Sequence, residues 1–499
     1  MLLAMTGVGL LAMMVQFPFS LNHDAAWHFY TALRFLLGDR IGLDIADINP
    51  PMALWLFSVP GIVAKSLGLD PAHVFRAFVF FVAALSLLLT RRALVELGVR
   101  EERLLLVSLA AVFLLMPGYH FGQREHLAAL LVLPYVSRAC LQIDPRPFGR
   151  FEAGSVALLA AIGICFKPYF LAVPLLVEVW LAFRMRSFRS LVRLETLTMV
   201  TVGIAYLGAV LAFVPHYLWL VVPQAMATYA GFESGPWAVA NEAAWALQLP
   251  LLALGIGVIA CRRIEPLSAA FIVAGLGFLV AALLQQKGWP YQLLPAALFC
   301  VAAAVVQLAN APRWRIPMAL AIGLAVLLPV LSNLRDNLDA NGTTSRVSRL
   351  ADVFSEPDIR SVYAFITSPR DMHPAVLSSG VRWADAHGVM IFLPGHIKAL
   401  DAEDHNPRAA KAIALSDTYL EAMLARFAKS PPDLLAFDRL PFKLGIANSA
   451  QFDYVDFLQR YPTFVSLIGQ YEERGSVGRF RLFQHLQGQW DHVLTEAQQ

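Results

Sequence analysis

The chain of 499 residues is 58% hydrophobic and only 15% charged, and its mean hydropathy is +0.59. This is far too apolar for a soluble protein of this length and indicates a polytopic membrane protein. The net charge of +3 is too small to suggest a nucleic-acid partner. The four cysteines lie in or beside apolar runs, which indicates neither a disulfide framework nor a cysteine metal site.

The first apolar run, residues 2–21, contains no lysine or arginine and no small-residue cleavage site. We interpret it as a retained first helix rather than a removed signal peptide. Because no positive segment precedes it, we also expect the natural start of the protein to lie upstream.

A polar stretch at residues 22–51 follows directly and contains four aspartates and two histidines. Charges beside a membrane span are costly to bury, so they usually serve chemistry or face solvent. A functional loop and an ordinary solvated loop are therefore both open interpretations.

Within this stretch, Asp24 begins a run in which Trp27 and Tyr30 fall at helical spacing. Such a helix is expected in the membrane interface, with its aromatic rings at headgroup depth. The helix dipole favours a carboxylate at a helix N-terminus, so capping is an alternative role for Asp24. Asp47 precedes Pro50 in extended or turning backbone, and two carboxylates on one short loop can converge on a single cavity.

Ten further apolar runs approach the length of a membrane-spanning helix. With the first run they predict about eleven transmembrane helices: 2–21, 73–90, 103–118, 126–142, 152–166, 168–183, 194–214, 243–261, 266–284, 290–309 and 316–333. Residues 51–69 are also apolar, but Lys65 interrupts them and Pro60-Gly61 predicts a helix break.

The basic residues decide the orientation. They cluster at residues 91–103, 146–150, 184–193, 262–263 and 313–315. If residues 51–69 lie along the surface or re-enter the membrane, all five clusters fall on the cytoplasmic side, as the positive-inside rule requires. We therefore predict a transmembrane domain at residues 1–333, with an outer loop at 22–72 that carries interfacial helices.

Residues 334–499 are polar and mixed, and we predict that they form a small α/β domain outside the cytoplasm, in the periplasm. Strand-like runs occur at 362–367, 389–393 and 434–437, and a hairpin is predicted from 464–471 to 479–483. Residues 416–429 are expected to form an amphipathic helix with Ser416 as its N-cap. The histidines of this part show no metal-ligand spacing and are interpreted as surface residues: His373, His387, His396, His405, His485 and His492.

Ionisable residues also stand at the outer ends of the spans, as Arg124-Glu125, Lys167 and Lys287. Each lysine alone is equally well explained by snorkelling to the interface. Three cations with carboxylates on the same face suit a phosphate-bearing ligand, with a carboxylate to activate a nucleophile. The sequence has no Gly-rich phosphate loop, HExxH or Gly-x-Ser-x-Gly motif, which argues against an ATP-driven pump, a metalloprotease and a serine hydrolase.

The order of these motifs over residues 1–330 resembles that of the GT-C integral-membrane glycosyltransferases. The similar branch uses polyprenyl-phosphate sugars and includes protein O-mannosyltransferases and the aminoarabinose transferases of lipid A. The matching features are an Asp after the first span, an acid before Pro50-Pro51, the Arg124-Glu125 pair, and a late Lys-x-Trp-Pro-Tyr from Lys287 to Tyr291. Gln292 departs from the pattern, because close relatives are expected to have histidine there.

The resemblance implies an inverting transfer of a sugar from a polyprenyl-phosphate donor to a glycan, lipid or protein acceptor, outside a bacterial inner membrane. It implies that Asp24 is the general base and that Asp47 positions a substrate. The expected substrate-binding residues are Arg124, Glu125, Lys167, Lys287, Tyr30, Trp289 and Tyr291. No redox or nucleotide cofactor is implied. Some members of the superfamily use a divalent metal, but none is predicted here.

Two other classes of function remain open: a lipid or solute transporter such as a flippase, and a non-catalytic scaffold of envelope assembly. Transporters tend to carry charges near the membrane midplane and to contain paired repeats. This sequence shows no repeat and has its charges at the outer ends, which favours the transferase.

Overall fold

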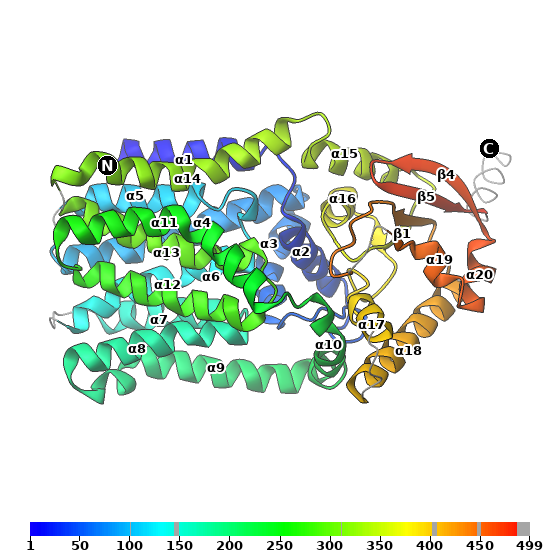
Figure 1. Ribbon diagram of the computed structural model, residues 1–499, viewed down its shortest axis with the longest axis horizontal. Coiled ribbons are helices and arrows are strands. Elements are labelled where there is room, and N and C mark those ends of the chain that lie inside the picture. Colours follow the sequence, from blue (N-terminus) through cyan, green and yellow to red (C-terminus); the bar gives the residue numbers. More distant parts are fainter. Residues whose placement is uncertain (100, 144–148, 311, 402–406, 447–450, 487–499) are drawn as a thin grey trace.

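The computed structural model describes residues 1–99, 101–143, 149–310, 312–401, 407–446 and 451–486. Two parts lie end to end along the long axis: a bundle of helices and a smaller part that contains a β-sheet (Figure 1). The bundle contains α1 (Leu2–Gln16), α4 (Pro71–Glu96), α5 (Glu102–Leu115), α6 (Arg124–Ala139), α7 (Arg150–Ile164), α8 (Ala172–Met185), α9 (Leu194–Phe213), α11 (Pro236–Cys261), α12 (Pro266–Gln285), α13 (Pro290–Ala309) and α14 (Arg315–Leu338).

Within the described residues, seven helices are long and apolar enough to cross a membrane: α4, α8 with the turn before it, α9, α11, α12, α13 and α14. This confirms the expected multi-pass membrane protein. Helices α1 and α3 (Met52–Leu67) are apolar but shorter. The number of about eleven spans stays a prediction.

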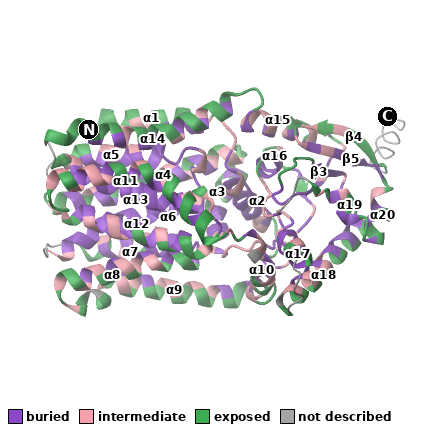
Figure 2. Cartoon of the chain, viewed as in Figure 1, coloured by how far each residue is buried: buried purple, intermediate pink, exposed green. Residues whose placement is uncertain are grey.

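Burial divides the bundle into an inner and an outer layer (Figure 2). In α13, every residue from Gln292 to Gln307 is buried, and α6 is buried along its whole length. By contrast, α9 buries only three residues and leaves its apolar side chains exposed, as a lipid-facing helix does. Small residues allow the inner helices to approach closely: a Cβ on Gly277 of α12 would lie 2.6 Å from the Cα of Val173 in α8.

Two further helices, α2 (His23–Leu36) and α3, lie at the end of the bundle that faces the sheet (Figure 1). The predicted break at Pro60 is wrong, because α3 continues through it. Packing on neighbouring helices holds the Pro-containing turn in place, and a Cβ on Gly61 would meet the side chains of Leu36 and Leu33 at 3.0 and 3.3 Å. The glycine therefore serves close contact between α3 and α2.

The aromatic face of α2 also differs from the prediction. Trp27 and Tyr30 are both 7% exposed and pack against the C-terminal part, so their rings do not face lipid. The Tyr30 hydroxyl donates to the Val381 carbonyl at 3.1 Å and accepts from the Trp383 amide at 2.7 Å. These two hydrogen bonds fasten α2 to the C-terminal part.

The C-terminal part confirms the predicted α/β character. Its five-stranded sheet has the order β2-β1-β3-β5-β4, with β1 parallel to β2 and β3, and β5 antiparallel to β3 and β4. The strands are β1 (Ser361–Phe365), β2 (Arg382–Trp383), β3 (Leu434–Asp438), β4 (Tyr471–Val477) and β5 (Phe480–His485). The helices are α15 (Thr343–Phe354), α16 (Met372–Ser379), α17 (Leu393–Leu400), α18 (Pro407–Lys429), α19 (Tyr454–Leu458) and α20 (Pro462–Ile468), and α10 (Val222–Thr228) reaches them from the bundle.

Several local predictions for this part are corrected. Residues 389–393 form no strand but lead into α17, whose start is favoured by Pro394 in its first turn. Ser416 is not an N-cap, because α18 begins nine residues earlier in the chain, at Pro407, and the Ser416 hydroxyl donates to the Ala412 carbonyl. The hairpin exists, but its first strand begins at Tyr471, since Pro462 starts helix α20. 

Four of the six histidines predicted to be surface residues of the C-terminal part are buried. The exposed fractions of His373, His387, His396 and His485 are all below 8%, because each ring packs against an aromatic ring, of Trp27, Tyr419, Phe457 and Tyr471 respectively. His405 and His492 lie outside the described residues.

Candidate functional site

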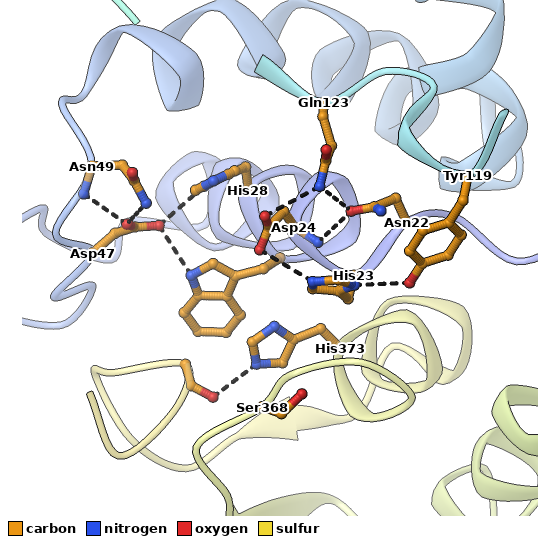
Figure 3. Close-up of polar contacts among 12 residues, drawn as sticks. Asn22, His23, Asp24, His28, Asp47, Asn49, Tyr119, Gln123, Ser368 and His373 are labelled. Atoms are coloured by element: carbon orange, nitrogen blue, oxygen red, sulfur yellow. Dashed lines mark hydrogen bonds and ion pairs between the residues drawn. The ribbon is translucent and has the colours of Figure 1, made fainter. Parts of the chain in front are cut away.

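The first turn of α2 lies where the bundle meets the C-terminal part, and it carries Asp24. Asn22 caps the helix by accepting a hydrogen bond from the Asp24 amide at 2.9 Å. The Asp24 carboxylate accepts from Gln123 Nε2 at 3.2 Å and lies 3.7 Å from His23 Nε2 (Figure 3). Burial alone would raise the pKa of this carboxyl, but the interaction with His23 and the charge of Arg124 outweigh it and lower the pKa. Asp24 is therefore ionised at neutral pH.

Asp47 lies beside the same helix and is held more tightly (Figure 3). Its Oδ2 is 3.0 Å from both Trp27 Nε1 and His28 Nδ1, and its Oδ1 accepts from the Asn49 amide at 2.9 Å and side chain at 2.6 Å. Burial opposes ionisation, but His28 and Arg124 hold the pKa of Asp47 well below its usual range. Asp24 and His28 are one helical turn apart on α2. Because His28 contacts Asp47, the carboxylates of Asp24 and Asp47 lie along the same face of this helix.

Arg124 begins α6 and is 3% exposed. Its charge acts on both Asp24 and Asp47. Within the described part of the chain, Nε and Nη1 of this guanidinium have no hydrogen-bond partner. A buried donor left unpaired costs about 1–3 kcal/mol, and more when it is charged, so this position is suited to an anionic ligand.

A second cation, Lys167, lies near Arg124. Its Nζ is 2.6 Å from Glu125 Oε1 and donates to Gln285 Oε1 at 2.9 Å, and it lies 5.4 Å from the ring centre of Tyr291. Burial, together with the charge of Arg124, lowers the pKa of Lys167, while Glu125 opposes the shift. The structure thus brings together Arg124, Glu125, Lys167 and Tyr291, which come from three separate segments of the sequence.

Lys287 lies in a different environment. Its Nζ donates to the Tyr229 carbonyl at 2.8 Å, lies 4.2 Å from the centre of the Tyr229 ring, and is 3.8 Å from Glu233. Burial lowers the pKa of Lys287 to about 8. Trp289 packs edge-on against Tyr229 and Phe232. Lys287 and Trp289 therefore hold the segment before α11 against the end of α12.

Further polar side chains gather around Asp24. Among the residues that the structure describes, Asn22 Nδ2 is buried and makes no hydrogen bond, while the side chains of His120 and Gln123 interact with each other. Burial lowers the pKa of His120 to about 4, so its ring is neutral. Donors and acceptors of this kind suit the hydroxyl groups of a ligand.

Sequence reasoning missed several of these residues. Asn22, His23 and His28 belong to the polar stretch that the sequence singled out, and Gln123 precedes the Arg124-Glu125 pair, so their neighbourhood was a usable signal. His373 had no such signal. Its ring stacks on Trp27, with 4.5 Å between centroids.

No group of three or more His, Cys, Asp or Glu residues in the described ranges is arranged to hold a metal ion. Asp47 already contacts protein donors with both oxygens.

Comparisons with known proteins establish the fold. The chain matches no protein-family model and no curated protein sequence. Among solved structures, ArnT from Cupriavidus metallidurans in the apo state aligns over 97% of both chains, with a TM-score of 0.57 and 12% identity. The arabinofuranosyltransferase AftD from Mycobacteria aligns with 97% of this chain and 41% of its own, with a TM-score of 0.45 and 13% identity. The Archaeoglobus fulgidus oligosaccharyltransferase aligns with 87% of this chain and 68% of its own, with a TM-score of 0.43 and 12% identity. The end-to-end alignment with ArnT shows that this chain shares the fold of that protein.

Proposed function

We propose that the protein is an integral-membrane glycosyltransferase. It transfers a sugar from a polyprenyl-phosphate donor to a hydroxyl or amine of an envelope glycan, lipid or protein, with inversion, on the extracytoplasmic face of a bacterial inner membrane. The shared fold supports the reaction class, and the contacts around Asp24 and Arg124 support the roles of the residues.

The observation that carries the proposal is the buried Arg124. Its guanidinium lies among carboxylates, yet two of its nitrogens have no partner anywhere in the described ranges. A guanidinium holds its N–H donors in a fixed plane and binds phosphate oxygens through charge-assisted hydrogen bonds. Lys167 adds a second positive charge beside it, while Glu125 and Gln285 fix the position of that lysine.

The proposed reaction needs a base and a stabilised leaving group. The acceptor O–H (or N–H) proton passes to the Asp24 carboxylate, and the acceptor atom forms a bond to the anomeric carbon. The bond from that carbon to the phosphate oxygen breaks, and its electron pair leaves with the polyprenyl phosphate. Arg124 and Lys167 stabilise the added negative charge. Asp47, already ionised and held by Trp27 and His28, keeps α2 and the following loop in place.

Sidedness rests on the basic loops. The last turns of α4 and the loop from α8 to α9 both contain arginines, and both lie at the end of the bundle away from the sheet (Figure 1). With those loops in the cytoplasm, Asp24 and the C-terminal part face outward, where a lipid-linked sugar is used.

Lipid and glycan analysis of a strain that lacks the protein tests the proposal. We expect one polyprenyl-phosphate sugar to accumulate and one envelope component to lack that sugar. Wild-type protein should restore both, and the Asp24→Asn variant, at equal protein level, should restore neither. An unchanged lipid and glycan profile in the deletion strain would refute the proposal.

A further inference from the structure

The C-terminal part contributes a histidine to the candidate site. His373 belongs to α16, is 2% exposed, and stacks on Trp27 at 4.5 Å with an interplanar angle of 25°. Trp27 in turn donates to Asp47. His373 is therefore packed on a side chain that holds one of the two carboxylates of the site.

The hydrogen bond that His373 makes fixes its tautomer. Its Nε2 lies 2.8 Å from the carbonyl oxygen of Gly388. A carbonyl oxygen can only accept, so Nε2 carries the proton, and Nδ1 of the neutral ring has a free lone pair. Burial lowers the pKa of His373 to about 3, which keeps the ring neutral.

The Nδ1 atom is buried and finds no partner among the residues that the structure describes. In Figure 3 this nitrogen lies on the side of the ring that faces His23 and Asp24. If His373 were only structural, its stacking on Trp27 and its hydrogen bond from Nε2 to Gly388 would account for the ring. They would not account for the buried lone pair on Nδ1. A buried acceptor without a partner is costly, which points to a ligand that donates to it.

We propose that Nδ1 of His373 accepts a hydrogen bond from the acceptor substrate bound beside Asp24. The acceptor would thus carry a second hydroxyl or amine next to the one that reacts. His373 is a positioning residue in this proposal, which rests on the proposed function and assigns one wall of the acceptor subsite to the C-terminal part.

The residues around Asp24 come from two parts of the protein, which supports separate sites for donor and acceptor. Arg124 and Lys167, which suit the donor phosphate, belong to the bundle, whereas His373 approaches from the C-terminal part. In an inverting displacement the nucleophile attacks opposite the leaving group. An acceptor placed opposite the phosphate therefore lies toward the C-terminal part, within reach of His373.

Three substitutions of His373 distinguish the hydrogen bond from Nε2 to Gly388 from the proposed hydrogen bond at Nδ1. In His373→Gln, the amide reaches the place of Nε2 and keeps the bond to Gly388, but the acceptor at Nδ1 is lost. In His373→Asn, the side-chain oxygen stands near the place of Nδ1, but the bond to Gly388 is lost. His373→Leu has nearly the same shape as the Asn variant and keeps neither bond.

The assay uses purified full-length protein, the donor lipid fraction of the deletion strain, and a dilution series of envelope extract from that strain as acceptor. We expect His373→Gln to raise the acceptor concentration for half-maximal rate by about tenfold, the loss of one hydrogen bond. The donor concentration for half-maximal rate and the melting temperature should stay near wild type. His373→Asn should need less acceptor than His373→Leu, although both should melt at a lower temperature.

Wild-type acceptor dependence in the Gln variant would overturn the inference. If the Gln variant does not fold, equal acceptor dependence in the Asn and Leu variants would overturn it as well. Absence of transfer by the wild-type protein would instead refute the proposed function, and the inference with it, so the two failures are distinguishable.

Discussion

Replacement of Arg124 by lysine tests the phosphate site most directly. The variant keeps the positive charge among the carboxylates, so the protein should still fold. Nε and Nη1 of Arg124 have no partner in the described structure, so they offer two charge-assisted hydrogen bonds to a ligand. A lysine has a single compact ammonium group. The Arg124→Lys variant therefore loses at least one of these two bonds. One such bond contributes about 1.5–3 kcal/mol, so Arg124→Lys should weaken binding of polyprenyl phosphate by roughly 10- to 150-fold.

The assay is equilibrium binding of radiolabelled polyprenyl phosphate to protein in lipid nanodiscs, with the matching polyprenol as the phosphate-free control. Arg138→Lys is the matched variant, because Arg138 is buried in the same helix but pairs with Glu195 at 2.6 Å. It should leave phosphate-lipid binding within about threefold of wild type, a change of less than about 0.7 kcal/mol. Equal binding by the Arg124→Lys and Arg138→Lys variants would show that the phosphate is held elsewhere.

Three further predictions concern the base, Lys287 and pH. Asp24→Asn should lower the transfer rate by about 10²-fold or more at unchanged melting temperature, since Asn22 and not Asp24 caps the helix; near wild-type turnover in a radiolabel transfer assay would remove Asp24 from the mechanism. Lys287→Gln should lower the melting temperature but leave polyprenyl-phosphate binding nearly unchanged, because the amine bonds to the Tyr229 carbonyl; a loss of binding with unchanged melting would contradict this. Asp24 can act as a base only when it is deprotonated, and its pKa lies below the ordinary value of 3.8. The transfer rate should therefore not fall as the pH is lowered from about 8 to about 5. A pH–rate profile in which the rate falls near pH 6 would contradict the assignment of Asp24 as the base.

The helical framework was predictable because its signal is local. The apolar run predicted at residues 290–309 coincides with α13, and that at 266–284 ends one residue before α12 does. Composition alone determines such segments, since lipid requires the backbone to satisfy its own hydrogen bonds. The continuity of α3 through Pro60 could not be predicted in the same way, because it depends on packing against α2 through Gly61.

The candidate site was predictable only in part. Asp24 and Asp47 are close in sequence, so their approach around one helix could be expected from the loop that joins them. The link through His28 and Trp27 requires the actual orientation of α2. His373 comes from a part of the chain far away in sequence, and no periodicity or spacing marks a residue whose role arises from tertiary packing alone.

The charges of the site explain why a fixed arginine suits the proposed reaction. Asp24, Asp47 and Glu125 bring three negative charges, and Arg124 and Lys167 bring two positive ones. A bound phosphodiester donor adds one negative charge. In the transfer, Asp24 gains a proton and becomes neutral while the leaving phosphate gains one negative charge, so the total charge of the site does not change. One unit of negative charge only moves from Asp24 to the phosphate. Arg124 acts electrostatically on Asp24 and would bind the phosphate as well, so the same buried guanidinium stabilises the charge before and after the step without moving.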